Sequence, residues 1–241
     1  MNMSFLKAEW RKLAIANYEI DSSLLTDFIP VGTGLDLWNG KCYVSLVGLM
    51  FLNTRLLKIK IPFHINFEEV NLRFYVRRLE NKKWKRGVVF IKEIVPKPAI
   101  TLVAKAIYRE NYETLPMQHK WVVTANERLV EYSWQKNAKW QTFRVRAKEQ
   151  ATRIEAGSET EFITEHYWGY AKVSQTKTNE YEVTHPKWTS YGVLDYAIDV
   201  DFEEVYGAKF SFLNEQTPVS VMLAEGSEIT IENKKTIEVH G

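Results

Sequence analysis

The segment INFEEVNLRFYVRRL at residues 65–79 decides the fold class. Successive side chains of a strand point to opposite faces, so Glu69, Asn71 and Arg73 would share one face. The opposite face is mostly apolar and carries Val70, Leu72, Phe74 and Val76. Because the second face is apolar and the first is rich in polar groups, the segment indicates a strand in a sheet whose polar face can still be enclosed.

Strands are expected along most of the rest of the chain. Segment 87–95 is expected to pair with 65–79 as a hairpin, with the basic segment 77–87 as a solvated connection. The sequence indicates three short helices, at 22–30, 99–111 and from Ser158 to about Tyr167. The other expected strands are 41–52, 118–124, 128–136, 140–148, 168–174, 179–185, 219–225 and 228–239, the last turning at Asn233-Lys234.

This pattern predicts a mainly β chain with a few short helices, forming a single domain over residues 1–241. The polar stretch 146–161 is the best candidate for an internal boundary, and we interpret it as a connection between two parts of one sheet system. Eight Trp, twelve Tyr and twelve Phe favour sheet faces around a substantial apolar interior.

Composition excludes several classes of protein. Thirty-two basic and thirty acidic residues give a net charge of +2, which is no signature of a nucleic-acid-binding protein. No apolar run reaches the roughly 18 residues of a membrane span, and the first twenty residues lack a signal-peptide pattern. The single cysteine, Cys42, forms no intrachain disulfide. We therefore expect a cytoplasmic protein with no nucleic-acid or membrane partner, and a homo-oligomer remains open.

Several spaced blocks resemble one known family. They are WRKLAIANYEIDSSLLTDFIPVGTGLDLWNGKCYVSLVGLMF, PFHINFEEVNLRFYV, RGVVFI, EFITEHYWGY and EYEVTHPKW, and they cover residues from about 10 to about 190. Together they resemble the uncharacterised bacterial YqjF-like family, a domain of unknown function in the acetoacetate-decarboxylase-like superfamily. The resemblance implies an antiparallel, cone-like β-barrel with a central cavity.

The resemblance also bears on chemistry. Acetoacetate decarboxylases form a Schiff base through a lysine in a Gly-aromatic-Pro-Lys-Lys context. The matching region here, KAIYRENYETLPM at 105–117, has no such lysine pair, and Tyr112 or Glu113 stands in the nucleophile's place. Glu69 resembles the decarboxylase glutamate on the equivalent strand. The departure argues against Schiff-base chemistry and leaves a polar cavity as the expectation.

The candidate catalytic residues are Glu69, Tyr112 and Lys105. A buried Lys105 would be a nucleophile, whereas helical spacing favours a surface lysine on the polar face of the helix. Lys92 is a second candidate of the same kind. Glu69 and Tyr112 are an acid–base pair in the alternative without a lysine.

The candidate ligand-binding residues are Glu69, Asn71, Arg73, His185 and Trp168. If the polar face of 65–79 lines a cavity, Arg73 binds an anionic group bidentately while Glu69 exchanges a proton. The alternative is an ion pair between Glu69 and Arg73 on a solvated face. His185 is expected to form a turn with Pro186 and to pack on a tryptophan.

No metal site and no cofactor are expected. His166, near Glu165, and His185 lie on separate segments, without the spacing of a zinc site and without a third ligand. A histidine that orients another polar group inside the barrel is the intermediate possibility.

Three functions follow from these observations. The favoured hypothesis is a protein that binds a small apolar or weakly acidic molecule in the barrel cavity, without Schiff-base chemistry. The second is an enzyme that acts on a small oxo acid through a displaced lysine or a Glu/Tyr pair. The third is a protein-interaction scaffold, which an exposed aromatic patch would mark.

Overall fold

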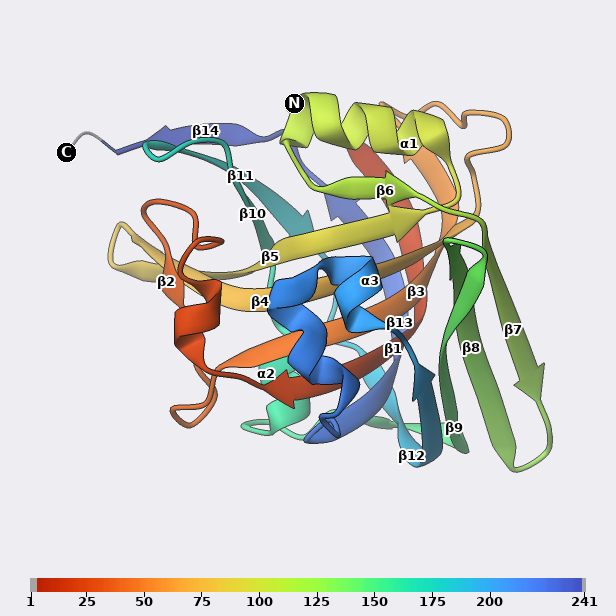
Figure 1. Cartoon of the computed structure of the whole chain (residues 1–241). Helices are drawn as coiled ribbons and strands as arrows, with labels where there is room; N and C mark the ends of the chain where they lie inside the picture. Colours follow the sequence, from red (N-terminus) through yellow and green to blue (C-terminus); the bar gives the residue numbers. More distant parts are fainter. Residues whose placement is uncertain (1–3, 240–241) are drawn as a thin grey trace.

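A computed structural model describes residues 4–239. It is mainly β with a few short helices, as the sequence predicts (Figure 1). The elements are β1 (Leu6–Glu19), η1 (Ser22–Leu25), β2 (Gly34–Leu35), β3 (Tyr43–Leu56), β4 (Phe67–Glu80), β5 (Lys83–Val95), α1 (Pro98–Val103), the π-helix η2 (Ala104–Tyr108), β6 (Tyr112–Thr114), β7 (Met117–Val123), β8 (Glu127–Lys136), β9 (Lys139–Arg153), α2 (Glu159–Thr164), β10 (Trp168–Lys172), β11 (Lys177–Thr184), β12 (Thr189–Asp199), α3 (Phe202–Tyr206), η3 (Ala208–Asn214), β13 (Ser220–Ile231) and β14 (Lys235–Glu238). The sheet is mixed rather than wholly antiparallel, since β5 pairs in parallel with β10 and with β6. None of the helices over residues 4–239 has the length and apolar character needed to cross a membrane.

Seven strands form a closed ring. The order is β13, β1, β3, β4, β5, β10 and β11, and β11 returns to β13 through Val183 opposite Ile231 and Thr184 opposite Thr230. All pairs in the ring are antiparallel except β10 with β5. Closure removes the unpaired edges that an open sheet would expose. The ring is the cone-like architecture that the family resemblance implies.

The ring has an apolar interior and an apolar exterior. Phe67 and Tyr75 of β4 face an interior cluster, to which Ile100 of α1, Ile107 of η2 and Phe162 of α2 also belong. Helix α1 packs near the Phe67 half of β4, whereas α2 packs near the other half, where Phe162 contacts Tyr75 at 5.7 Å between ring centroids. Helix α1 therefore covers the interior near Phe67, and helix α2 covers it near Tyr75.

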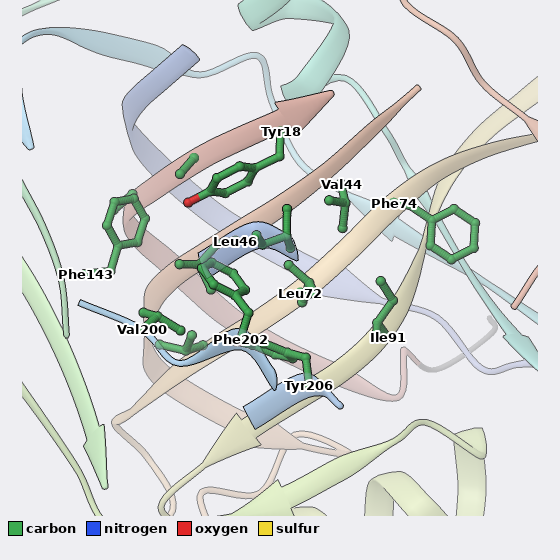
Figure 2. Close-up of a cluster of buried hydrophobic side chains, with 14 of the residues drawn as sticks. Tyr18, Val44, Leu46, Leu72, Phe74, Ile91, Phe143, Val200, Phe202 and Tyr206 are labelled. Atoms are coloured by element: carbon green, nitrogen blue, oxygen red, sulfur yellow. The ribbon is translucent and has the colours of Figure 1, made fainter. Parts of the chain in front are cut away.

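The outer face of the ring is buried by a second layer. Strands β8, β9 and β12 continue from β13, and α3 and η3 pack beside them. Figure 2 shows Phe202 and Tyr206 of α3 lying against Leu46 and Leu72 of the ring, with Phe143 of β9 nearby. Strand β4 is thus buried on both faces, so its polar interior face is enclosed, as one of the two sequence interpretations holds.

Several sequence expectations need correction. Residues 220–231 form one strand rather than two, continuous through Gly226 with its φ of +79°. Strand β14 pairs with β11, so the described residues form no hairpin at Asn233-Lys234. The basic segment 77–87 is a hairpin end with a two-residue turn at Asn81-Lys82, because β4 and β5 pair as far as Glu80 and Lys83. In the polar stretch 146–161, expected from the sequence to be a connection, residues 146–153 belong to β9.

We predict that Gly48→Ala destabilises the contact between the two layers. A Cβ at Gly48 would lie 2.6 Å from the ring of Tyr132, whose hydroxyl donates to the carbonyl oxygen of Lys12 in a bulge of β1. Overpacking of this kind costs about 1–3 kcal/mol, or roughly 2–10 °C in Tm for a chain of this length. Gly34→Ala is the matched control, since no atom lies within 4 Å of its added Cβ. Equal melting temperatures for the two variants in calorimetry would contradict the role of Gly48.

Candidate functional site

Strand β4 carries three polar side chains into the ring. Glu69, Asn71 and Arg73 are 4%, 2% and 7% exposed, and they alternate with residues of the outer cluster. Asn71 Nδ2 donates to Glu69 Oε1 at 3.0 Å. The described residues include no hydrogen bond between Glu69 and Arg73, and both side chains are buried. The alternative of a Glu69–Arg73 ion pair on a solvated face is therefore wrong.

An apolar pocket lies beside Glu69. Its volume is about 150 Å³, and its walls come mainly from the ends of β1 and β3, the segment after β3, and α1 with η2. Phe51, Phe67, Ile100 and Val103 are among the apolar lining residues. The polar groups on its surface are few and include Glu69, Glu110, Tyr112 and Tyr181. An apolar chamber with a few convergent polar groups is the usual form of a small-molecule site.

Three carboxyl groups cluster at this pocket. Glu69 of β4, Glu93 of β5 and Glu110 after η2 are all buried. The Tyr112 hydroxyl donates to Glu69 Oε2 at 3.2 Å, and the Tyr181 hydroxyl donates to Glu110 Oε1 at 2.9 Å. We call these five residues the acid cluster.

Burial changes the acidity of all three carboxyl groups. Loss of hydration raises the pKa of Glu69 to about 7, although Asn71, Tyr112 and Arg73 favour its charged form. Burial and the nearby Glu69 raise the pKa of Glu110 to about 8, against the hydrogen bond from Tyr181. The pKa of Glu93 also rises well above its ordinary value, through burial and repulsion from Glu110 and Glu69. At neutral pH Glu110 therefore stays mostly protonated, and Glu69 is close to half-ionised.

Tyr112 interacts with two of these carboxyl groups. Its hydroxyl donates to Glu69 Oε2. Burial, followed by the charges of Glu69 and Glu93, raises the pKa of Tyr112 well above its ordinary value, so the phenol keeps its proton. Glu93 Oε2 has no hydrogen-bond partner among the described residues, and it is thus a buried polar atom left unsatisfied beside the cluster.

The position of the Tyr181 ring depends on Gly169, which has no side chain. It pairs with Gly169 across β10 and β11, and a Cβ on Gly169 would lie 2.1 Å from the Tyr181 ring. The ring lies across the neighbouring strand at this position, with its hydroxyl on Glu110. Gly169 is thus part of the construction of the acid cluster.

Arg73 is a buried cation that forms no ion pair with a carboxylate of residues 4–239. Its Nε has no hydrogen-bond acceptor among the described residues, and its Cζ lies 5.7 Å from the ring centroid of Tyr75. Its positive charge contributes a downward shift to the pKa of Glu69, His166 and His185. In Glu69 the larger effect of burial outweighs this contribution. A guanidinium with an unsatisfied buried donor is suited to an anionic group of a ligand.

A second polar cluster lies near α2. His166 Nε2 is 3.2 Å from Asp36 Oδ2, and Arg86 Nε donates to the same oxygen at 2.6 Å. Burial, together with the charges of Arg86 and Arg73, lowers the pKa of His166 to about 4 against the opposing effect of Asp36. His166 is thus a neutral, buried histidine engaged with a carboxylate, which matches the intermediate possibility from the sequence.

The other sequence candidates lie away from the pocket. Lys105 is exposed, and Lys92 is half-buried on the outer face, where it binds Glu113. His185 stacks between Tyr167 and Trp188, at centroid distances of 4.6 and 4.3 Å. Trp168 packs against the outer cluster, with Lys85 Nζ 3.9 Å above its ring.

The residues expected from the sequence and the residues found at the site overlap only in part. Glu69, Asn71, Arg73 and Tyr112 are on the inside of the ring, and of these Glu69 and Tyr112 line the pocket. Asn71, Arg73, Lys105, His185 and Trp168 are not among its lining residues. Sequence reasoning missed Glu93, Glu110 and Tyr181. One of them could have been found from the sequence: Glu93 is an acidic residue within the apolar segment GVVFIKEIV, which indicates a buried carboxyl group. Among residues 4–239 no three His, Cys, Asp or Glu side chains form a set suited to a metal ion.

Comparison with known proteins agrees with this architecture. YqjF of Bacillus subtilis (strain 168), an uncharacterized protein, is 31% identical over 86 residues, which are 35% of this chain and only 34% of YqjF. Acetoacetate decarboxylase from Legionella pneumophila superposes with a TM-score of 0.67 at 13% identity, covering 98% of this chain and 90% of that one. The enduracididine biosynthesis enzyme MppR superposes with a TM-score of 0.68 at 10% identity, covering 99% and 91%.

These solved structures share the fold with this chain. A family model matches residues 7–228, which is nearly the whole of the closed ring and its outer layer. The chain therefore belongs to the DUF2071 family of uncharacterized conserved proteins.

Proposed function

We propose that the ring interior binds a small, mostly apolar molecule that carries one carbonyl or carboxyl group, without forming a Schiff base. The observation that carries the proposal is the acid cluster: Glu69, Glu110, Tyr112 and Tyr181 line a mostly apolar pocket, and the buried Glu93 interacts with them. Buried ionisable groups with shifted pKa values are costly, and they gather at functional sites.

The size and lining of the pocket define the ligand class. A volume of about 150 Å³ matches the roughly 150 Å³ of an apolar protein cavity that accepts benzene. Phe51, Phe67, Ile100 and Val103 offer contacts to an apolar body. The polar head of the ligand would then meet Glu110, which is protonated at neutral pH and donates to a carbonyl oxygen.

The lining supports non-covalent binding. A Schiff base needs a neutral amine, and no lysine is among the residues that line the pocket. Lys105 is exposed, and Lys92 binds Glu113 and the carbonyl oxygen of Val205 on the outside of the ring. The displaced-lysine version of the enzyme hypothesis thus lacks an amine at the site.

A second candidate function has one specific observation in its favour. Glu69, with a pKa of about 7, accepts a hydrogen bond from Tyr112 and borders the pocket. A carboxylate with that pKa is suited to removing a proton next to a carbonyl group, with Tyr112 as the acid. MppR, which has this fold, is described in complex with pyruvate, a small oxo acid. An enzyme that enolises a small oxo acid would use the same site.

Filling the pocket should abolish binding. We expect ligand-observed NMR with a panel of benzoic acid, benzaldehyde, pyruvate and 2-oxobutyrate to detect saturable binding of at least one compound. Ala104→Trp fills the pocket and should weaken that binding tenfold or more, because Ala104 lines it. Ala106→Trp is the control, since Ala106 is exposed on the same helix and does not line the pocket. Equal affinity in both variants would place the ligand elsewhere, and no binding from the panel would remove the support for this ligand class.

The proton held by Glu110 should appear in the pH dependence of stability. Its pKa rises from 4.5 to about 8 on folding, so the stabilisation from protonation is complete below pH 4.5 and is lost as pH approaches 8. Glu110→Gln keeps an acceptor for Tyr181 and removes the titration. We expect an unchanged Tm at pH 5 and a Tm several degrees higher at pH 8, measured by calorimetry.

The control for this measurement is Glu203→Gln, an exposed carboxyl in the first turn of α3. It should leave the difference in Tm between pH 5 and pH 8 as in the unsubstituted protein. The same Tm shift at both pH values in Glu110→Gln would mean that Glu110 does not hold its proton in the folded state.

The second candidate function has its own test. If Glu69 enolises an oxo acid, hydrogen–deuterium exchange at C3 of 2-oxobutyrate should be accelerated, with a rate that rises as pH passes about 7. Glu69→Gln should lower the rate by about 10²–10⁴-fold, whereas Lys105→Ala should not change it. Borohydride should trap no adduct. Exchange at the uncatalysed rate, measured by NMR, would eliminate the enzyme and leave binding as the function.

A further inference from the structure

The surface around the pocket entrance is built from two segments, residues 55–64 after β3 and residues 97–109 of α1 and η2. Both segments line the apolar pocket, and Figure 1 shows the first as a loop beside the start of α1. Ile61 and Ala99 are pocket-lining and exposed at the same time, so the pocket reaches the surface here. We call this surface the entrance face.

The entrance face presents large apolar side chains to solvent. Phe63 is 87% exposed, Leu102 is 70% exposed and Ile59 is 66% exposed. Phe63 and Leu57 adopt φ angles of +64° and +48°, which apolar residues with a Cβ rarely do. The loop thus holds its apolar side chains outward in an unfavourable backbone conformation. An exposed apolar patch at the rim of a pocket is typical of an interaction surface.

The same face is strongly cationic. Arg55, Lys58, Lys60, Lys105 and Arg109 are exposed, and none of them forms an ion pair with another described residue. Neither segment contains an Asp or a Glu. Elsewhere on the protein the cations are paired more often, as Arg78 and Lys85 are with Glu180. The entrance face therefore combines unpaired positive charge with exposed apolar groups.

Two types of occupant fit this combination poorly. A second copy of the chain docked through a twofold axis would place the cations of one entrance face against those of the other, because such an interface is self-complementary. A free polyanion would match the charge and leave Phe63 and Ile59 in water. An anionic lipid surface satisfies both features, since its headgroups attract Lys and Arg and its acyl boundary accepts apolar side chains.

We propose that the entrance face docks peripherally on anionic phospholipid membranes, with Ile59 and Phe63 inserted and the cations at the headgroups. The pocket then opens toward the acyl boundary, where apolar molecules concentrate. The docking stands independently of what the pocket binds. It departs from the sequence expectation of no membrane partner, which rested on the lack of a spanning segment alone.

Vesicle co-sedimentation tests the docking. The full chain is mixed with vesicles of phosphatidylcholine containing 30% phosphatidylglycerol, or with phosphatidylcholine alone. We expect binding to the anionic vesicles that weakens as salt is raised. Phe63→Ser should lower the partition coefficient about tenfold or more. Lys58→Glu with Lys60→Glu should lower it about 30-fold or more, since two attracted charges are lost and two repelled charges are added.

The matched control is Lys82→Glu with Lys83→Glu, which makes the same change in net charge on exposed lysines of the β4–β5 hairpin. This pair should retain binding to within about threefold, and all variants should keep the Tm of the unsubstituted protein because the changed side chains are exposed. Failure to bind anionic vesicles, or an equal loss in the control pair, would overturn the proposal. Self-association that Phe63→Ser abolishes, seen by analytical ultracentrifugation, would overturn it in favour of a second copy.

Discussion

Residues 67–76 of strand β4 are buried on both faces, and the chemistry of the interior depends on this burial. Its outer residues pack under α3 and η3, so no solvent-facing side remains for a charge. Glu69, Asn71 and Arg73 must then be accommodated inside the ring. Burying an isolated carboxylate costs far more than protonating it at neutral pH, so the interior raises the pKa of its carboxyl groups and supplies phenols as hydrogen-bond donors. The chemistry of the site thus originates in the packing of one strand.

The turn after η2 completes the acid cluster. Arg109 adopts a left-handed conformation, with φ of +64°, and this reverses the chain so that Glu110 and Tyr112 face the ring. Two amides hold the turn: Asn179 Nδ2 donates to the carbonyl oxygen of Tyr108, and Asn111 Nδ2 donates to that of Ile91. Because both ends of the turn are tied to ring strands, the cluster is positioned before any ligand arrives, which lowers the entropic cost of binding.

The fold and part of the site could be predicted because they depend on local periodicity. The two-residue alternation along 67–76 placed Glu69, Asn71 and Arg73 on one face, and Ser158 caps α2 as expected, accepting from the amide of Glu161. A change of register cannot be read from the same alternation: the pairing of β1 with β3 shifts between Arg11 and Ala14, where Lys12 has a φ of +53°. Glu110 and Tyr181 are 71 residues apart and meet only through ring closure, which no short pattern encodes.

The charge balance of the interior bears on the headgroup that it accepts. Protonated Glu110 can donate a hydrogen bond to a carbonyl oxygen in the pocket, whereas a carboxylate placed beside a half-ionised Glu69 is repelled. Arg73 offers the opposite environment on the same strand face, with a donor left unsatisfied. Four residues along a strand span about 13 Å, so a small ligand held at Glu69 does not also reach Arg73, which is not among the pocket-lining residues. The acid cluster therefore decides the polar group that the pocket accepts, and it favours a neutral carbonyl group.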